Sequence, residues 1–562
     1  MTSYDYVLKD GDYDTSCDYL EFPNPAYIKQ CYRRAHTICQ KAGITIDDIV
    51  RMRPKFWGFN RHLVAMRDPA VSTILGIHWN LCMGTIARFS HDQPHLVKLL
   101  EDLERFDICG EFLLTEVSHG LDAYNLETTA TLLPDGSFEL HTSNSGAAKA
   151  MPPTTPWAGM PRVGVVSARL LVGDVGRGVR PFVVRLNDAN EMSPGVISQP
   201  LPKKSGSKAL DHAITTFNRV RLGSDSLLGS LNVSSNERSD FLDLISRVSV
   251  GTLSFSMGNI PALRQAAYIA GTYSLRRHVA GNSPSQRVPI IRFSTQYRPI
   301  LNALSQALVF DAFAEDAIKM FCQGGLSSAV NHSVATCFKA TVGPATQITL
   351  VQLADRCGWQ GLFNYNRIIE MASTLKGNGI AEGDYTVLCI RLVSEVLLGR
   401  YELPPAKIKD CRLARHEAGV WQEARDTLAS VAMSSHRGKA YNTYILPRSR
   451  ALVEASGHRM AYEAALDKEG FSREVLALFE STCVMSDLGW YCIDENGSRQ
   501  ELLAYDAEVA EKLLPRLREL LSETGAASWT TAPITSTEAW DELLRKLPVY
   551  RCNGTNREKP RL

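Results

Sequence analysis

The pattern of apolar residues changes twice along this 562-residue chain, and these changes limit the fold more than any other feature. Before about residue 110 the apolar residues follow the three-and-four spacing of helices, and in residues 26–43 this spacing ends at Gly43. From residue 111 to about 222, short apolar runs alternate with turn residues, which is typical of antiparallel strands. Helical spacing returns near residue 233. This segregated order predicts an α+β multidomain fold rather than alternating βαβ units.

The same changes of pattern predict four domains, in agreement with the usual length of about 150 residues per domain. The predicted domains are an N-terminal helical domain (1-110), a central β domain (111-232) and two C-terminal helical domains (233-400 and 401-562). Turns are expected at Pro134-Asp135-Gly136 and in the glycine-rich segment that contains Gly173, Gly176 and Gly178, because proline fixes φ and glycine allows a positive φ. Pro515 is expected to kink or offset the last long helix.

Composition excludes several classes of protein. Lys plus Arg is 61 and Asp plus Glu is 60, so 61 − 60 leaves a net charge of +1 and no overall field to attract nucleic acid or an anionic membrane. The 13 cysteines contain no CxxC pair, which argues against a zinc ribbon and a thioredoxin-type motif and favours reduced thiols in an intracellular protein. We expect no signal peptide, no membrane span and no metal site. The ending Pro560-Arg561-Leu562 loosely resembles a peroxisomal S-K-L address.

The common catalytic and nucleotide-binding motifs do not occur. The sequence has no GxxxxGK[ST], GxGxxG, HExxH or GxSxG. The absence of these motifs argues against four classes of enzyme: P-loop enzymes, Rossmann dehydrogenases, zincins and α/β-hydrolases. Ser118 and His119 are adjacent, and adjacent residues rarely form the geometry of a Ser-His nucleophile. A prediction of function must therefore rest on another segment of the sequence.

That string is FLLTEVSHGLDAYNLETTATLLPDGSFELHTSNSGAAKAMP, from Phe112 to Pro152. By itself it predicts a β-hairpin with a polar loop. As a whole it resembles the flavin-binding β domain of the acyl-CoA dehydrogenase superfamily, and most of all the acyl-CoA oxidase branch. The resemblance implies a central antiparallel β-barrel that binds FAD, with Thr115 on the pyrimidine edge of the flavin and Gly120 at a close turn. Met151 and the residue before it replace two family tryptophans, which alters the flavin face.

The resemblance continues through the helical part of the chain. RVSVGTLSFSMG…AAYIAGTYSLRRHVAG and the segment 290–310 resemble the next family helices, which implies that Arg277 and Gln296 bind FAD across a dimer interface. RCGWQGLFNYNRI occupies the position of a family cofactor segment and keeps Gly358 and Gly361.

GNGIAEGDYTVLCIRLVSEVLLGR (377–400) resembles the oxidase segment that carries the catalytic base. The resemblance implies that Glu382 is the base and that Gly383 lies against the substrate. Tyr385 replaces a family asparagine here.

The resemblance implies a homodimeric enzyme that uses FAD to desaturate an acyl-CoA or other acyl thioester, with oxygen as the electron acceptor, so that hydrogen peroxide is the second product. Two alternatives remain open at this point. One is a dehydrogenase that passes electrons to a protein carrier, and the other is a non-redox protein on the same fold with a weakened flavin site. The departures from the family pattern suggest a substrate other than an ordinary straight-chain fatty acyl-CoA.

Overall fold

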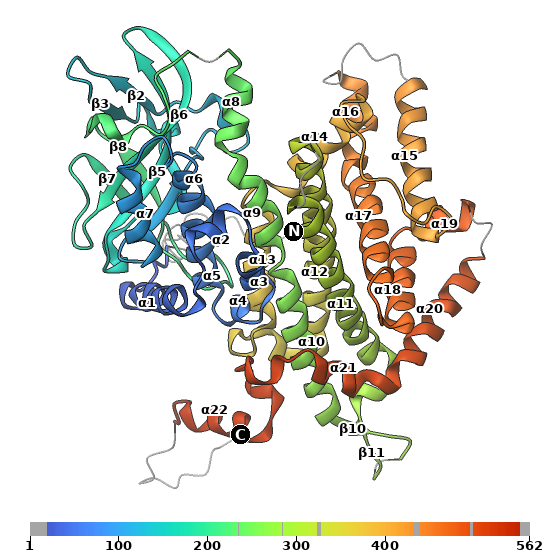
Figure 1. Cartoon of the computed structure of the whole chain (residues 1–562). Coiled ribbons are helices and arrows are strands. Elements are labelled where there is room, and N and C mark those ends of the chain that lie inside the picture. Colours follow the sequence, from blue (N-terminus) through green and yellow to red (C-terminus); the bar gives the residue numbers. More distant parts are fainter. Residues whose placement is uncertain are drawn as a thin grey trace, which may run out of the picture.

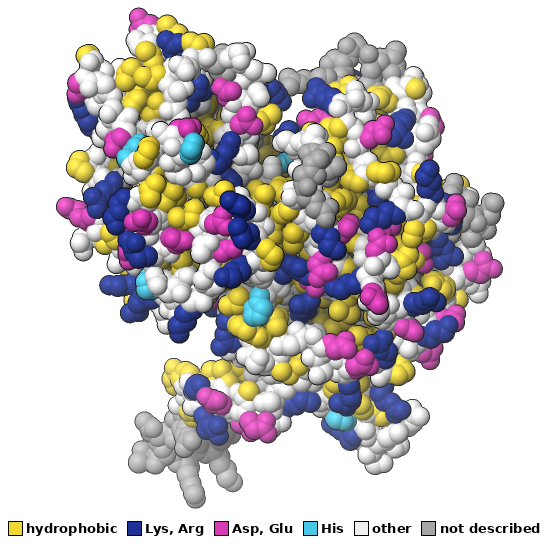
Figure 2. Space-filling view, in the orientation of Figure 1, with side chains coloured by type: hydrophobic (Ala, Val, Ile, Leu, Met, Phe, Trp, Pro, Cys, Tyr) yellow, Lys and Arg dark blue, Asp and Glu magenta, His cyan; other side chains and the backbone are white. Residues whose placement is uncertain are grey.

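The structure is a computed structural model that describes residues 20–233, 235–283, 285–322, 327–430, 438–494 and 498–550. The β-sheets lie at one side of the molecule and a row of long helices forms its centre (Figure 1). The helices of residues 412–513 lie at the opposite side, and the helices after residue 516 lie along the bottom. Lys and Arg side chains intermingle with Asp and Glu side chains over the visible face (Figure 2), as expected for a net charge of +1. The C-terminal tripeptide lies outside the described residues.

The N-terminal part is helical, as predicted. α1 ends at Gly43, whose φ of 59° closes the helix in the left-handed region that glycine adopts easily. The buried face of α1 includes Ile28, Cys31 and Ala35, three of the apolar positions that the sequence pattern identifies. The elements of this part are α1 (Pro25–Ala42), α2 (Ile46–Val50), α3 (Pro54–Arg61), α4 (Val64–Arg67), α5 (Pro69–Leu75), the π-helix η3 (Gly76–Met83), α6 (Gly84–Ala87) and α7 (Leu96–Glu104).

The continuous helix Pro69–Ala87 is long and apolar enough to span a membrane by length and composition. The expectation that the chain has no membrane span therefore stays a prediction. In the structure 78% of its most apolar window is buried inside the protein, so this helix has the environment of a core helix. Its middle is the π-helix η3, a form that usually occurs in single turns at functional sites.

The predicted β region forms two sheets. The larger sheet has the order β1-β5-β2-β3-β9, with β6 paired to β5, and the smaller has the order β4-β8-β7. The turns at Gly136 and Gly173 are confirmed, with φ of 84° and 59°. Gly176 and Gly178 do not belong to the turn, because both lie inside strand β6. The strands are β1 (Cys109–Leu113), β2 (Thr129–Leu132), β3 (Phe138–His141), β4 (Lys149–Pro153), β5 (Arg162–Val172), β6 (Val175–Asn187), β7 (Val196–Pro200), β8 (His212–Phe217) and β9 (Val220–Leu222).

The larger sheet differs from a purely antiparallel one in two pairings. β1 pairs in parallel with the first half of β5, and β2 pairs in parallel with its second half. β1 and β2 thus follow each other along one edge of the 11-residue strand β5. The physical reason is the length of β5, because one long strand can pair with two short ones, and the segments between β1 and β5 are long enough for a crossover connection.

The remaining chain is mainly helical. Pro515 lies in a short 3₁₀ turn between α20 and α21, so the predicted interruption is confirmed. The small hairpin of β10 and β11 was not expected. The elements are α8 (Glu237–Leu244), α9 (Ser246–Ser256), α10 (Asn259–Arg276), β10 (His278–Ala280), β11 (Arg287–Pro289), α11 (Ser294–Cys322), α12 (Ser328–Arg356), α13 (Ile368–Ile380), α14 (Tyr385–Leu397), α15 (Arg412–Ser430), α16 (Lys439–Tyr444), α17 (Ser449–Leu466), α18 (Arg473–Ser486), α19 (Leu488–Asp494), α20 (Arg499–Leu513), α21 (Leu517–Glu523) and α22 (Thr537–Lys546). The four predicted domain boundaries stay predictions.

A buried charge cluster joins the first helix to the sheets. Arg162 of β5 donates to Asp211 at 2.8 Å, and both side chains are fully buried. The Tyr32 ring of α1 lies 4.4 Å from the Arg162 guanidinium, and the Tyr32 hydroxyl donates to Asp211. Because a buried charge is costly unless it is paired, this cluster fixes the N-terminal helices against the sheets.

Candidate active site

Glu382 lies in the short turn between α13 and α14. Its φ is 56°, and that of the following Gly383 is 97°. Left-handed backbone costs a non-glycine residue about 1–2 kcal/mol, so the surrounding structure must hold Glu382 in place. Asp384 then caps α14 by accepting from the backbone amide of Thr386 at 2.8 Å.

Two residues from distant helices hold this turn through its carbonyl groups. The ammonium of Lys339, on α12, donates to the carbonyl oxygens of Ala381 and Gly383 at 2.5 and 2.7 Å. The hydroxyl of Thr252, on α9, donates to the carbonyl oxygen of Glu382 at 2.8 Å. All three consecutive carbonyl groups are therefore fixed, which offsets the strain of the turn.

The Glu382 side chain points from this turn onto the surface of α9. A Cβ atom built on Gly251 would lie 1.3 Å from Oε2 of Glu382, so only glycine leaves room for the carboxylate there. Oε2 is buried and has no hydrogen-bond partner among the described residues. Burial raises the pKa of Glu382 to about 8, although the charges of Lys339 and Arg247 act in the opposite direction.

Arg247 lies one helical turn before Gly251 on α9 and is also buried. Its Nε donates to the carbonyl oxygen of Asn80 at 3.1 Å, and Nη1 donates to that of Ile49 at 3.2 Å. Its Nη2 is buried without a partner in the described structure. Burial lowers the pKa of Arg247 to about 10, so at neutral pH Glu382 faces a buried cation on this side as well.

A small cavity opens beside Glu382. Its volume is about 10 Å³, which is about the room that one water molecule needs. Its walls come from α3, the helix Pro69–Ala87 and α9. The lining residues other than Glu382 are Phe56, Phe59, Asn60, Leu75, Gly76, Trp79, Asn80, Ser254 and Phe255. The carboxylate therefore faces a small cavity with four aromatic side chains and three polar side chains in its wall.

The loop after β1 carries Thr115, which is half-buried. Its carbonyl oxygen accepts from the amide of Ala150 at 3.0 Å, and its hydroxyl has no partner among the described residues. Gly120 is exposed, and a Cβ there would find its nearest neighbour in the Thr115 methyl group at 3.9 Å. The structure thus presents a free hydroxyl beside an open glycine turn.

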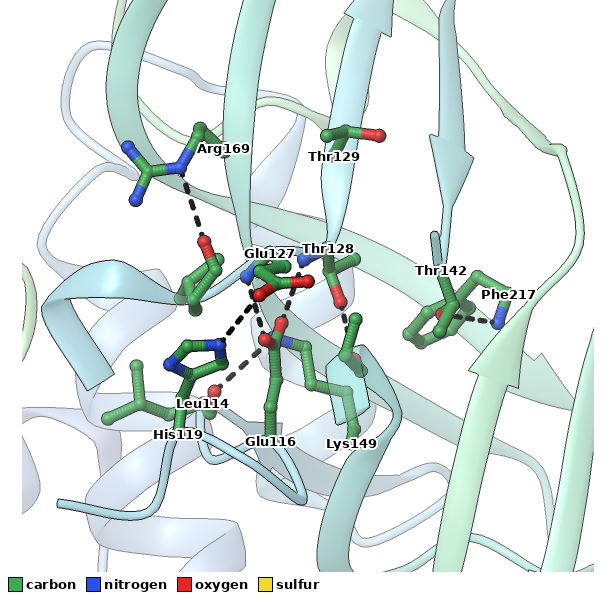
Figure 3. A network of polar contacts seen from close by, with 12 residues as sticks. Leu114, Glu116, His119, Glu127, Thr128, Thr129, Thr142, Lys149, Arg169 and Phe217 are labelled. Carbon is green, nitrogen blue, oxygen red and sulfur yellow. Dashed lines mark hydrogen bonds and ion pairs between the residues drawn. The ribbon is translucent and has the colours of Figure 1, made fainter. Parts of the chain in front are cut away.

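A buried ion pair supports this loop from behind (Figure 3). Lys149 donates to Glu116 Oε1 at 2.9 Å, and both side chains are fully buried. The same carboxylate accepts from the amides of Glu127 and Thr128 at 2.7 and 2.9 Å. Burial favours the protonated acid, but Lys149 and the two amides outweigh it and lower the pKa of Glu116.

The other predicted cofactor residues lie together at a different place. Gln296 donates to the Ser274 hydroxyl and to the carbonyl oxygen of Arg356, both at 2.8 Å, and so joins the end of α10 to the end of α12. Arg277 follows α10 directly and is exposed. The hairpin of β10 and β11 that begins after Arg277 lies at the opposite end of the molecule from β2 and β3 (Figure 1).

Gly358 and Gly361 follow the same end of α12, in the 3₁₀ segment η9 (Gly358–Leu362). Gly358 has a φ of 59°, and a Cβ built on it would have no neighbour within 4 Å. A Cβ on Gly361 would lie 2.0 Å from the Ala354 carbonyl oxygen, so close backbone packing explains this glycine. The side chain of Trp359 between them is 60% exposed.

The sequence analysis missed the residues that surround Glu382. Lys339 could have been noticed in the sequence, because it is the only charged residue in the run 328–354 of α12.

Gly343 and Gly379 make room for Tyr385, whose hydroxyl would lie 1.9 Å from a Cβ on Gly343. The departure at Tyr385 is thus matched by two glycines. Within the described residues no group of His, Cys, Asp and Glu side chains is arranged to hold a metal ion.

The chain has helices before and after a curled sheet, and the buried Glu382 lies just before helix α14. Solved acyl-CoA oxidases share this fold. Residues 251–397 match the family described as acyl-CoA oxidase, C-alpha1 domain. Acyl-CoA oxidase 3 of Yarrowia lipolytica superposes with a TM-score of 0.78 at 18% identity, covering 96% of this chain and 87% of that one. Acyl-CoA oxidase-1 of Caenorhabditis elegans, solved with FAD and ATP, superposes with a TM-score of 0.73 at 17% identity, covering 94% and 88%.

Curated relatives agree with the structural neighbours. Peroxisomal acyl-coenzyme A oxidase 3 of Homo sapiens is 27% identical over 60% of this chain and 51% of its own length. Peroxisomal acyl-coenzyme A oxidase 2 of Arabidopsis thaliana is 23% identical over 68% of this chain and 58% of its own length. The chain therefore spans between half and three fifths of these two relatives. These matches confirm the resemblance to the acyl-CoA oxidase branch.

Proposed function

We propose that this protein is an FAD-dependent oxidase of acyl thioesters, in which Glu382 removes the α-proton of the substrate. The observation that carries the proposal is the state of Glu382: a buried carboxylate with an unpartnered Oε2, held on a strained turn and facing a solvent-excluding cavity. A carboxylate that the fold supports at this cost, without a hydrogen bond to satisfy it, is suited to accept a proton from a ligand.

The residues of the β domain fit a flavin. Thr115 offers a free hydroxyl, Gly120 leaves open space, and the Glu116–Lys149 pair fixes the loop from which both extend. These are the two positions that the resemblance assigns to the pyrimidine edge and the close turn of FAD. When bound, FAD supplies the acceptor for the hydride from the β-carbon and transfers the electron pair to oxygen, which yields hydrogen peroxide.

The chain itself provides base, orientation and exclusion of water. Burial brings the pKa of Glu382 to about 8, which strengthens it as a base for a weakly acidic C–H group. Lys339 and Thr252 fix the backbone from which the carboxylate extends, and the amide of Glu382 is available to polarise the thioester carbonyl as the resemblance implies. The small cavity leaves room for about one water molecule beside the carboxylate, so bulk water is kept away from it.

We also propose a homodimer, in which each flavin lies between two subunits. Thr115 and Gly120 follow strand β1, whereas Arg277 lies between α10 and β10. The hairpin of β10 and β11 lies at the opposite end of the molecule from β2 and β3 (Figure 1). If both groups serve one flavin, the second group must come from a partner. The exposed apolar side chains Trp359 and Leu362, next to Gly358, are suited to such an interface.

The proposed location is the peroxisome, because the curated relatives are named peroxisomal. Oxygen is preferred to a protein carrier as the acceptor because the relatives are named oxidases. Nothing in the charge pattern favours nucleic acid or a membrane surface as a partner.

The proposal is tested with purified protein. We expect a yellow protein with an oxidised-flavin spectrum that bleaches when an acyl-CoA is added without oxygen and releases hydrogen peroxide when oxygen returns. A colourless protein that FAD does not reconstitute would favour a non-redox role. Bleaching without peroxide release would favour a dehydrogenase.

A further inference from the structure

Strand β4 contains a bulge directly beside the loop that carries Thr115. Where the register of β4 on β8 shifts, Met151 and Pro152 of β4 together stand opposite one residue of β8. The preceding residue, Ala150, donates through its amide to the Thr115 carbonyl oxygen at 3.0 Å. The bulge is therefore joined to the loop of the proposed flavin site, and bulges next to active sites often direct a side chain.

Met151 has a left-handed backbone within this bulge. Its φ is 80°, and the residue is 46% exposed. Left-handed backbone is unfavourable for a residue with a β-carbon, so other contacts must hold Met151 in this conformation. Methionine has a flexible, polarisable side chain that contacts aromatic rings favourably. Its exposed side chain is thus suited to contact a flavin ring bound at the Thr115 loop.

His212 of β8 holds the bulge through a hydrogen bond to Met151. Nδ1 of His212 lies 2.7 Å from the Met151 carbonyl oxygen. Because a carbonyl oxygen only accepts hydrogen bonds, Nδ1 carries the proton. Burial lowers the pKa of His212 to about 4, so the ring is neutral at physiological pH. Nε2 is therefore without a proton and acts as an acceptor.

Lys204, in the segment between β7 and β8, supplies a donor for that nitrogen. Its Nζ lies 3.2 Å from His212 Nε2. Among the described residues no carboxylate lies within ion-pair distance of Lys204, whereas the adjacent Lys203 pairs with Glu21. A His212 ring rotated by half a turn would lose both of its contacts. Lys204 and the Met151 carbonyl together therefore fix the tautomer and the orientation of His212.

We propose that Lys204 and His212 are positioning residues for the flavin: Lys204 orients His212, and His212 holds Met151 in the conformation that contacts the cofactor. This inference rests on the proposed function, because it concerns the flavin of that reaction. Both side chains act through the backbone of Met151 and not on the thioester. Their loss should weaken the binding of FAD and change its surroundings.

The test measures how tightly and in what surroundings FAD is bound. Equilibrium dialysis of the full-length holoprotein against FAD gives the dissociation constant, and visible circular dichroism reports on the surroundings of the bound flavin. For Lys204→Met we expect a Kd about three- to tenfold higher than for wild type, which corresponds to the loss of one hydrogen bond. His212→Leu should raise the Kd by at least as much. The circular dichroism should change in both variants.

Two further lysine variants serve as controls. Lys203→Met removes the same charge from the adjacent residue, which lines the same cavity of about 790 Å³ but pairs with Glu21. It should keep the wild-type Kd and circular dichroism. Lys204→Arg keeps a donor at the critical position and should restore most of the affinity.

His212→Asn separates orientation of the ring from simple attraction between Lys204 and the FAD phosphates. Asparagine retains a donor close to the position of Nδ1 but has no second ring nitrogen, so it needs no lysine to fix a tautomer. Adding Lys204→Met to His212→Asn should therefore change the Kd by less than about twofold. A loss of affinity as large as in Lys204→Met alone would mean that Lys204 acts by its charge, and would overturn the inference.

The outcomes distinguish this inference from the proposed function. If wild-type protein binds FAD and both Lys204→Met and His212→Leu bind it equally tightly with unchanged circular dichroism, the positioning inference is wrong and the proposed function stands. An equal loss of affinity in Lys203→Met would also overturn it. If wild-type protein does not bind FAD, the proposed function fails, and this inference fails with it.

Discussion

Glu116 and Glu382 are two buried glutamates in opposite electrostatic states. Glu116 accepts three hydrogen bonds, from Lys149 and from two backbone amides, and its pKa is lowered. Glu382 has an unpartnered Oε2, its pKa is raised to about 8, and its backbone is held in the left-handed region. Glu116 directly follows Thr115 in the loop after β1, whereas Glu382 lies between α13 and α14.

The difference separates a structural carboxylate from a chemical one. A carboxylate whose acceptors are all occupied is fixed in its charged form and stabilises a loop. A carboxylate without donors is poised to take a proton, and the fold must support it through its neighbours instead. Lys339 shows this indirect support, because it donates to the carbonyls on either side of Glu382 and not to its carboxylate.

The largest effect is expected from removing the base. Glu382→Gln keeps the shape of the side chain but cannot accept the proton, so turnover should fall by about 10²–10⁴-fold while flavin stays bound. Glu116→Gln is the matched control and should lower stability while retaining turnover in the protein that remains folded. Steady-state peroxide release and the flavin spectrum measure both. Normal turnover of the Glu382→Gln protein would refute the assignment of the base.

Displacing the Glu382 carboxylate without changing its chemistry should have the next largest effect. The methyl group of Gly251→Ala would overlap Oε2, so the carboxylate must move by an ångström or more. A misplacement of about 1 Å costs about 10²-fold in rate. Gly58→Ala, in helix α3 with nothing within 4 Å of its new Cβ, should leave kcat unchanged. Equal activity of the two variants would mean that the carboxylate position is not critical.

Breaking the Glu116–Lys149 pair should affect stability rather than chemistry. Lys149→Met leaves Glu116 buried with its two amide donors only, and losing one partner of a buried pair costs about 3–5 kcal/mol. Adding Glu116→Gln should recover part of this loss, because the uncompensated charge is then gone. Urea unfolding midpoints measure both proteins. No loss in the single variant would show that this pair does not stabilise the flavin loop.

The smallest expected effect is a shift in the pH profile. Because Glu382 must be deprotonated to act, kcat/KM should rise with pH and level off above about pH 8, where its pKa lies. Lys339→Met removes a cation that favours the carboxylate, so the midpoint should move to higher pH. A midpoint that moves to lower pH, or a profile that stays flat through this range, would contradict the assigned environment of Glu382.

Local pattern was enough to predict much of the fold. The helix of residues 26–43, the turns at Gly136 and Gly173 and the interruption at Pro515 follow from side-chain periodicity and from the backbone limits of glycine and proline. The pairing of one long strand with two short parallel ones did not follow, because pairing depends on where the intervening chain returns.

The candidate active site was also predicted only in part from the sequence. The sequence alone determined the order of helices and strands and singled out Thr115 and Glu382 through the strings that contain them. Only the tertiary structure brought Arg247, Lys339 and Asn80 to the same carboxylate. The physical reason is that patterning is local, whereas a pKa, a cavity and a free hydrogen-bond acceptor are set by residues that folding gathers from distant parts of the chain.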